Sequence, residues 1–144
     1  MIEQVSVFLE NSTGRLAQLT RALGDAGIDM HALMVADTEE FGVVRIICDR
    51  PQAARELLGN LGFGVSVTPV TAVEVPDRPG GLADVLEALG AGGVNVEYAY
   101  CYVKPGEDVA VDVFKVDGIS ADGILTRAGF RVLEASDLYS VGNG

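Results

Sequence analysis

The residues with the clearest chemical potential form a short polar segment between two apolar patterns: Asn11, Ser12, Thr13, Gly14, Arg15 and Leu16. The alternating valines and leucine before this segment predict a strand, and the leucines at helical spacing after it predict a helix. The first N–H groups of a helix have no partner inside it, and the helix dipole favours negative charge there. The segment is therefore a candidate site for a small anion such as a carboxylate, and glycine at its centre lets a ligand approach the backbone.

The same segment recurs later in the chain as Asp77, Arg78, Pro79, Gly80, Gly81 and Leu82. A shift of 66 positions superposes Gly14 on Gly80 and Leu16 on Leu82, and further along it superposes Asp29 on Asn95. A Gly- and Ala-rich composition could produce such matches by coincidence, but these glycines fall at corresponding junctions between expected elements. The pattern indicates a tandem repeat, with one unit at residues 1–70 and a second at 71–144.

Each repeat has the hydrophobic periodicity of a β-α-β-β-α-β unit. In the first repeat we expect strands at about 2–9, 28–36, 42–48 and 63–70, and helices at about 14–26 and 51–61. Asp49 is a candidate cap for the second of these helices, with Pro51 in its first turn. In the second repeat we expect strands at about 71–76, 94–103, 108–116 and 130–136, and helices at about 80–91 and 120–128.

This order of elements predicts the α+β class, as two ferredoxin-like repeats whose antiparallel sheets carry both helices on one face. The other face also looks apolar: Tyr98, Tyr100 and Tyr102 alternate along one strand, which is typical of sheet packing rather than of ligand stacking. The second strand of each unit lies at a sheet edge, and bare edges invite pairing. We therefore expect residues 29–36 to lie beside residues 95–102, joining the repeats edge to edge as one eight-stranded sheet, and we expect a homodimer.

Composition excludes several classes of protein. The chain has 144 residues, 49% of them hydrophobic, which is enough for a core and argues against disorder. A formal net charge of −11 disfavours binding to nucleic acid or to an anionic membrane. No apolar run is long enough to span a membrane, the N-terminus lacks the pattern of a secretion signal, and the two cysteines are far apart in sequence. These features favour a cytoplasmic protein.

No convincing catalytic or metal-binding constellation is visible. His31 is the only histidine, and no serine or cysteine lies in a recognisable nucleophile motif. Asp37, Glu39 and Glu40 are close in sequence, but such a run is typical of a solvated turn. The glycine turns lack the lysine of a phosphate-binding loop. We therefore expect no enzyme activity, no cofactor and no metal.

At the two glycine turns the sequence resembles a tandem pair of ACT domains, small modules that bind amino acids and regulate amino-acid metabolism. Each turn is followed by a helix and then by Gly27-Ile28-Asp29-Met30 or Gly93-Val94-Asn95-Val96. The resemblance covers essentially the whole chain, with no catalytic domain attached. It implies a regulatory, allosteric protein that binds an L-amino acid between the first turn of one repeat and the second strand of the other, and an enzyme of amino-acid metabolism as partner.

The resemblance implies two pseudo-equivalent sites. One combines Asn11 and its turn with Asn95, and the other combines Asp77, Arg78 and their turn with Asp29. Asparagine can accept from an ammonium and donate to a carboxylate, whereas two aspartates repel each other and the ligand's carboxylate. We therefore expect the Asn11 site to bind more tightly.

Two other functions remain open. The chain could be a ligand-free module for protein interaction or dimerisation, or a small acylphosphatase-like enzyme on the same scaffold. The enzyme would need an arginine in a phosphate-binding loop, for which Arg78 is the nearest candidate. Turnover of an acyl phosphate distinguishes the enzyme from a binding protein.

Overall fold

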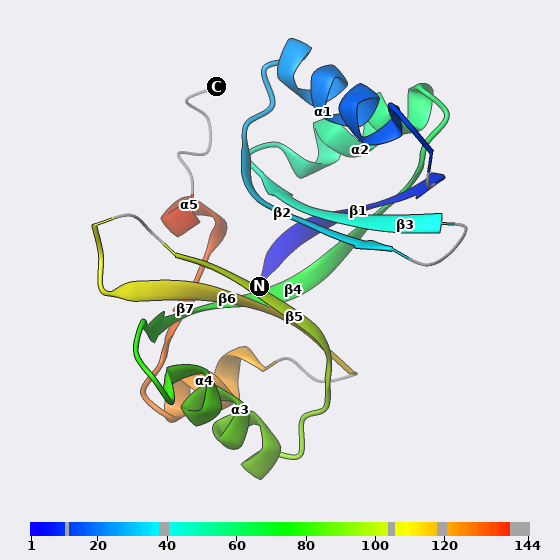
Figure 1. Cartoon of the computed structure of the whole chain (residues 1–144). Helices are drawn as coiled ribbons and strands as arrows, with labels where there is room; N and C mark the ends of the chain where they lie inside the picture. Colours follow the sequence, from blue (N-terminus) through cyan, green and yellow to red (C-terminus); the bar gives the residue numbers. More distant parts are fainter. Residues whose placement is uncertain (11, 38–40, 104–105, 118–120, 139–144) are drawn as a thin grey trace. The chain divides into compact units, whose positions relative to one another are not determined.

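The computed structural model describes residues 1–10, 12–37, 41–103, 106–117 and 121–138, and the chain divides into two compact units (Figure 1). Of the described residues, those within Glu3–Thr68 and those of Ala135–Leu138 belong to the first-repeat unit. The second-repeat unit comprises Pro69–Glu134 together with Met1–Ile2. In the part that is described, no helix has the length and apolar character needed to cross a membrane.

The first-repeat unit is a four-stranded antiparallel arrangement with two helices on one face. Its strand order is β2-β3-β1-β4, and α1 and α2 pack against each other over the sheet (Figure 1). Buried aliphatic side chains from both layers, such as Val5, Leu19 and Leu58, form its core. Its elements are β1 (Ile2–Glu10), α1 (Arg15–Asp25), β2 (Met30–Asp37), β3 (Phe41–Cys48), α2 (Pro51–Asn60), the start of β4 (Gly64–Pro76) and α5 (Ala135–Leu138).

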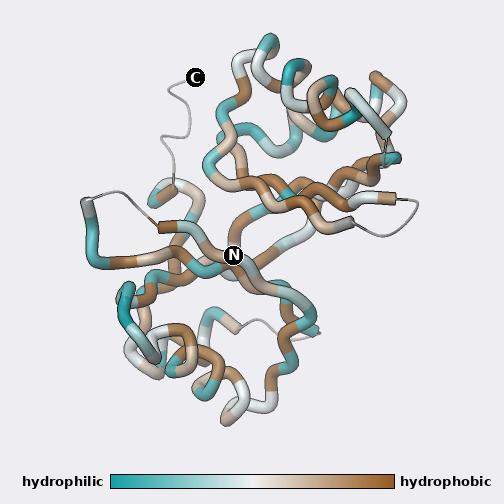
Figure 2. Tube along the Cα trace, viewed as in Figure 1, coloured by the Kyte–Doolittle hydropathy of each residue, from teal (hydrophilic) through white to brown (hydrophobic). Residues whose placement is uncertain are grey.

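The second-repeat unit repeats this architecture. The later part of β4 pairs with β6 and with β7, and β5 pairs with β6 at the edge. Helices α3 and α4 cover one face, with Val85, Phe114 and Leu125 in the core. The strands are largely hydrophobic, whereas hydrophobic and hydrophilic residues alternate along the helices (Figure 2). The remaining elements are α3 (Gly81–Ala91), β5 (Val96–Val103), β6 (Val109–Val116), α4 (Asp122–Arg127) and β7 (Arg131–Leu133).

The predicted α+β fold of two ferredoxin-like repeats is confirmed, with differences in the sheet. The described residues contain seven strands rather than eight, because the strands predicted at 63–70 and 71–76 are one strand, β4, which begins at Gly64. The predicted pairing of residues 29–36 with 95–102 is wrong within the chain. Among the described residues β2 pairs only with β3, and β5 pairs only with β6, so β2 and β5 stand at the two ends of the strand order.

Two local predictions also differ from the structure. The last strand covers only Arg131–Leu133, and the chain then forms the short helix α5 instead of continuing to 136. Asp49 does not cap α2, although Pro51 does lie in the first turn of this helix as predicted. Its carboxylate instead accepts a hydrogen bond from the backbone N–H of Asp29, at 3.1 Å, and so fastens the start of the second strand.

Candidate functional site

The two glycine turns have nearly the same backbone geometry. Gly14 has φ 89° and ψ −11°, and Gly80 has φ 87° and ψ −10°, a left-handed conformation that favours glycine. Each is followed by a helix whose first intrahelical bond returns to that glycine, from Gln18 in α1 and from Asp84 in α3. The early N–H groups of both helices therefore point out of the helix end, where an anion is stabilised.

In the first-repeat turn the arginine side chain is held by two contacts. The Arg15 guanidinium lies over the Phe63 ring at 4.4 Å and donates to the Gln18 side chain at 2.7 Å. Ser12, Thr13 and Leu16 are exposed. Asn11 lies outside the described residues.

The second-repeat turn is held against the strands behind it. The N–H of Asp77 donates to the Asp108 carbonyl at 2.9 Å, which ties the turn to the segment between β5 and β6. Gly81 is buried where a Cβ atom would overlap the Pro76 carbonyl oxygen. The Arg78 side chain is exposed, and its guanidinium lies 3.5 Å from the Asp84 carboxylate.

Two adjoining hollows, each of about 120 Å³, open at this second turn. They share Leu82 at the start of α3, Cys101 on β5 and Asp112 on β6. The first is completed by Ala99 and Tyr100, and the second by Val75, Pro76, Asp77, Arg78 and Ala110. A single water needs only about 30 Å³, and drug-sized ligands occupy about 300–1,000 Å³, so these hollows suit a small metabolite.

Asp112 is the unusual residue of this site. It is only 4% exposed, and its Oδ2 atom has no hydrogen-bond partner among the described residues. Burial raises the pKa of the carboxyl, an effect opposed by a hydrogen bond from the Cys101 thiol. Burial also raises the pKa of that thiol, as do the nearby carboxylates of Asp112 and Asp77. The site thus contains a buried acid whose charged form is compensated only in part, by the thiol of Cys101.

The first repeat has no such acid at the corresponding place. In β3 the residue that faces Val7 of β1 is Val44, whereas in β6 the residue that faces Val73 of β4 is Asp112. On the other side, Val44 pairs with Val35, and Asp112 pairs with Cys101. A valine pair in one unit is thus replaced by a cysteine–aspartate pair in the other. Asp112 and Cys101 are absent from the site that the sequence predicts, although an acid inside the apolar run of residues 109–116 was a visible signal.

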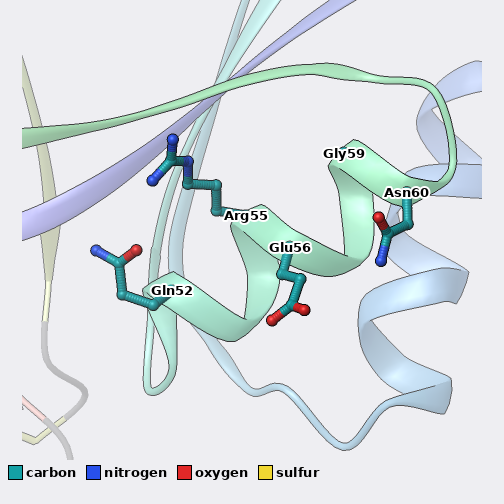
Figure 3. A pocket seen from close by; sticks show the side chains of 5 residues that line it. All are labelled: Gln52, Arg55, Glu56, Gly59 and Asn60. Carbon is teal, nitrogen blue, oxygen red and sulfur yellow. The ribbon is translucent and has the colours of Figure 1, made fainter.

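A larger hollow, of about 410 Å³, lies on the surface of α2 (Figure 3). The described residues that line it all belong to this one helix: Gln52, Arg55, Glu56, Gly59 and Asn60. Four of these residues have side chains, which are spread along the helix and do not meet around one point (Figure 3). The two hollows at the second turn are instead lined by residues of α3, β4, β5 and β6 and contain a buried acid. We therefore place the candidate site at the second turn despite its smaller volume.

The remaining predicted residues lie at the starts of the second strands. Asp29 is exposed, its carboxylate lies 4.0 Å from His31 Nε2, and its carbonyl accepts from the Asp49 N–H at 3.2 Å. Asn95 is exposed, and its carbonyl accepts from the Asp117 N–H at 3.2 Å. The structure brings Asp77, Arg78 and Leu82 together around one hollow. The convergence of either turn with the other repeat's second strand, and the preference for Asn11, stay predictions.

No group of three or more histidine, cysteine or carboxylate side chains that could hold a metal occurs in the described ranges.

A family model described as an ACT domain pair matches residues 1–138. The crystal structure of protein BT0572 from Bacteroides thetaiotaomicron is similar at 35% identity, with a TM-score of 0.90 over 97% of this chain and 96% of that one. None of the curated proteins matches the sequence significantly.

Regulatory subunits of aspartate kinase share the fold at lower identity. The ligand-free subunit from Thermus thermophilus has 18% identity and a TM-score of 0.68, over 88% of this chain and 89% of that one. The subunit from Thermus flavus also has 18% identity, with a TM-score of 0.60 over 78% of this chain and 80% of that one.

Proposed function

The chain belongs to the family of ACT domain pairs, and we propose that it is a non-enzymatic regulatory protein that binds an L-amino acid. The observation that carries this proposal is the pair of hollows at the start of α3, where a helix N-terminus lies near a buried carboxyl without full compensation. An amino acid has a carboxylate for the helix end and an ammonium for the acid.

The ligand would report to a protein partner. A regulatory module transmits binding only if the ligand interacts differently with two states of the assembly. We propose an enzyme of amino-acid metabolism as the partner, in keeping with the regulatory role of the family and with the subunits of aspartate kinase that share its fold.

Ligand binding is expected to raise the melting temperature. An amino acid at about 100 times its Kd stabilises the native state by roughly 2.7 kcal/mol, which for a chain of this size is a shift of roughly 5–10 °C. The measurement is a thermal scan with each common L-amino acid at millimolar concentration. An unmoved melting temperature across the whole panel contradicts the proposal. Turnover of an acyl phosphate would then indicate an enzyme. No thermal shift and no turnover would indicate a module for protein interaction.

We also propose that two chains pair through the outer edges of β2 and β5, which have no strand partner among the described residues of one chain. Exposed apolar side chains, among them Leu33 on β2 and Val103 on β5, lie on these edge strands. Pairing there would cover them and would bring the first turn of one repeat near the second strand of another, as the predicted Asn11–Asn95 and Asp77–Asp29 sites require.

Light scattering at micromolar concentration is accordingly expected to give twice the 15.1 kDa mass of one chain. The double variant Leu33→Lys/Val103→Lys places charges at both edges and should shift the mass to that of a single chain. Leu61→Lys is the matched control, because Leu61 is similarly exposed but follows α2, away from these strands. A wild-type mass of 15.1 kDa, or a dimer that survives both edge charges, would sink this arrangement.

A further inference from the structure

We infer that Asp112 is the specificity-determining residue of the second-repeat site and that it accepts the primary ammonium of a small zwitterionic ligand whose carboxylate lies at the N-terminus of α3. The inference rests on the proposed function and deepens it, because it assigns one end of the ligand to one side chain. It also places the working site in the second repeat, whereas charge reasoning on the turns alone favours Asn11.

The first step is that the buried carboxylate of Asp112 would be stabilised by a positively charged hydrogen-bond donor. Its side chain lines both hollows, is 4% exposed, and receives a hydrogen bond from the Cys101 thiol, while Oδ2 has no partner among the described residues. A thiol is a weak donor and carries no positive charge. An ammonium brings three donors and a full charge, and its hydrogen bond to a carboxylate is about twice as strong as a neutral one.

The second step is the sign of the other charges around the hollows. Asp77 adds a second carboxylate at the rim, which favours an ammonium and disfavours a simple anion. The ligand's carboxylate needs donors, which are present at the same rim. Helix α3 begins there, and its first intrahelical bond runs from the Asp84 N–H to the Gly80 carbonyl. The N–H groups of Leu82 and Ala83 therefore have no partner within the helix, and Arg78 lies at the same turn.

The third step is the contrast with the first repeat. The counterpart of Leu82 is Leu16, and the counterparts of Cys101 and Asp112 are Val35 and Val44. That surface is apolar and offers an ammonium no carboxylate of this kind. The helix N-terminus is common to both turns, so the buried acid is what distinguishes them. Buried charges without partners are costly, and their presence at a hollow is characteristic of a binding site.

The experiment is isothermal titration calorimetry of the full chain with the L-amino acid that gives the largest thermal shift, its N-acetyl derivative and its carboxamide. The N-acetyl derivative lacks the ammonium and the carboxamide lacks the carboxylate. Asp112→Asn removes the charge with little change in shape, and Asp112→Val installs the first-repeat residue. Asp117→Asn is the control, because Asp117 is an exposed carboxylate just after β6 that lines neither hollow.

Wild-type protein should bind the free amino acid and should bind the N-acetyl derivative at least tenfold more weakly. Both Asp112 variants should lose about 10- to 100-fold in affinity, and Asp117→Asn should bind like the wild type. Wild-type affinity should fall as acidification protonates Asp112, whose charged neighbours at the hollow are Asp77 and Arg78, with the Cys101 thiol opposite it.

Equal binding by Asp112→Asn, or equal binding of the N-acetyl derivative, overturns the role of Asp112 while the proposed function stands. A wild type that binds no amino acid overturns both. Loss of binding in the Asp112 variants supports the inference when the melting temperature of the ligand-free variant is unchanged or raised. Loss of binding together with a lowered melting temperature assigns Asp112 a structural role and overturns the inference. If both Asp112 variants still bind tightly and only Asn11→Ala loses affinity, the site belongs to the first repeat and the inference is overturned.

Discussion

Asp112→Val is expected to raise the free energy of unfolding of the ligand-free protein by about 1–3 kcal/mol at pH 7. The carboxylate is 4% exposed and its Oδ2 atom has no partner among the described residues, so the folded state bears a desolvation cost that valine removes. The corresponding position of the first repeat already holds Val44, which is fully buried. Each kcal/mol corresponds to a rise in melting temperature of roughly 2–4 °C for a chain of this size.

The stabilisation of the protein by Asp112→Val should increase as the pH rises from acid to neutral. Burial raises the pKa of Asp112 in the folded state above its usual value of 3.8. The protonated carboxyl therefore contributes fully to the stability of the wild type below the usual pKa. This contribution is lost as the pH rises through the raised pKa of the folded state. The difference in melting temperature between Asp112→Val and wild type should be smallest near pH 4 and largest at neutral pH. A difference that is constant with pH, or largest in acid, contradicts the burial of this acid.

This pattern also separates binding from folding. Replacing a residue that serves only stability destabilises the protein. Asp112→Val should instead stabilise the fold and lower the affinity for the ligand. Binding sites commonly bear such a cost, because groups arranged for a ligand are imperfectly compensated without it. Stability and affinity that fall together would show Asp112 to be a structural residue.

Gly81→Ala is expected to destabilise the fold by about 1–3 kcal/mol, a typical cost of overpacking. A Cβ atom at this position would overlap the carbonyl oxygen of Pro76 and would lie 3.1 Å from a methyl group of Val75. Both belong to β4, which cannot yield without disturbing its pairing with β6. The start of α3 would therefore move away from the strands that line the hollows, and amino-acid affinity should fall with stability.

Gly90→Ala is the matched control in the same helix. No atom lies within 4 Å of the Cβ that it adds, and alanine is the better helix former, so a gain of up to about 1 kcal/mol is expected. Chemical denaturation of Gly81→Ala, Gly90→Ala and the wild type measures the free energy of unfolding of each. Equal effects of the two substitutions would contradict the close approach of α3 to β4.

Most of the fold could be predicted because the apolar periodicity is local. The alternation in residues 2–9 predicts a strand, and the leucine stripe after Gly14 predicts a helix. The glycines at matching positions indicate the tandem repeat. The merger of residues 63–70 and 71–76 into β4 was not predictable in this way. Only the pairing partners on either side decide whether such a run is one strand or two, and those lie far away in sequence.

The candidate site could be predicted only in part, for the same reason. The turn residues Asp77, Arg78 and Leu82 follow from a local motif, and they do line a hollow. Asp112 and Cys101 are eleven positions apart, and their pairing depends on the register of β5 against β6. Composition gives no indication of that register, and an acid in a strand is usually exposed, so its burial emerges only in three dimensions.

The most direct test of ligand binding is equilibrium dialysis of the wild-type protein against an equimolar mixture of the common L-amino acids, with the retained amino acids quantified by mass spectrometry. The proposed function predicts that one or a few amino acids are enriched on the protein side, up to about one molecule per binding site. The role inferred for Asp112 predicts in addition that Asp112→Asn reduces this enrichment. Equal concentrations of every amino acid on both sides of the membrane, at protein concentrations well above micromolar, would contradict the proposed function.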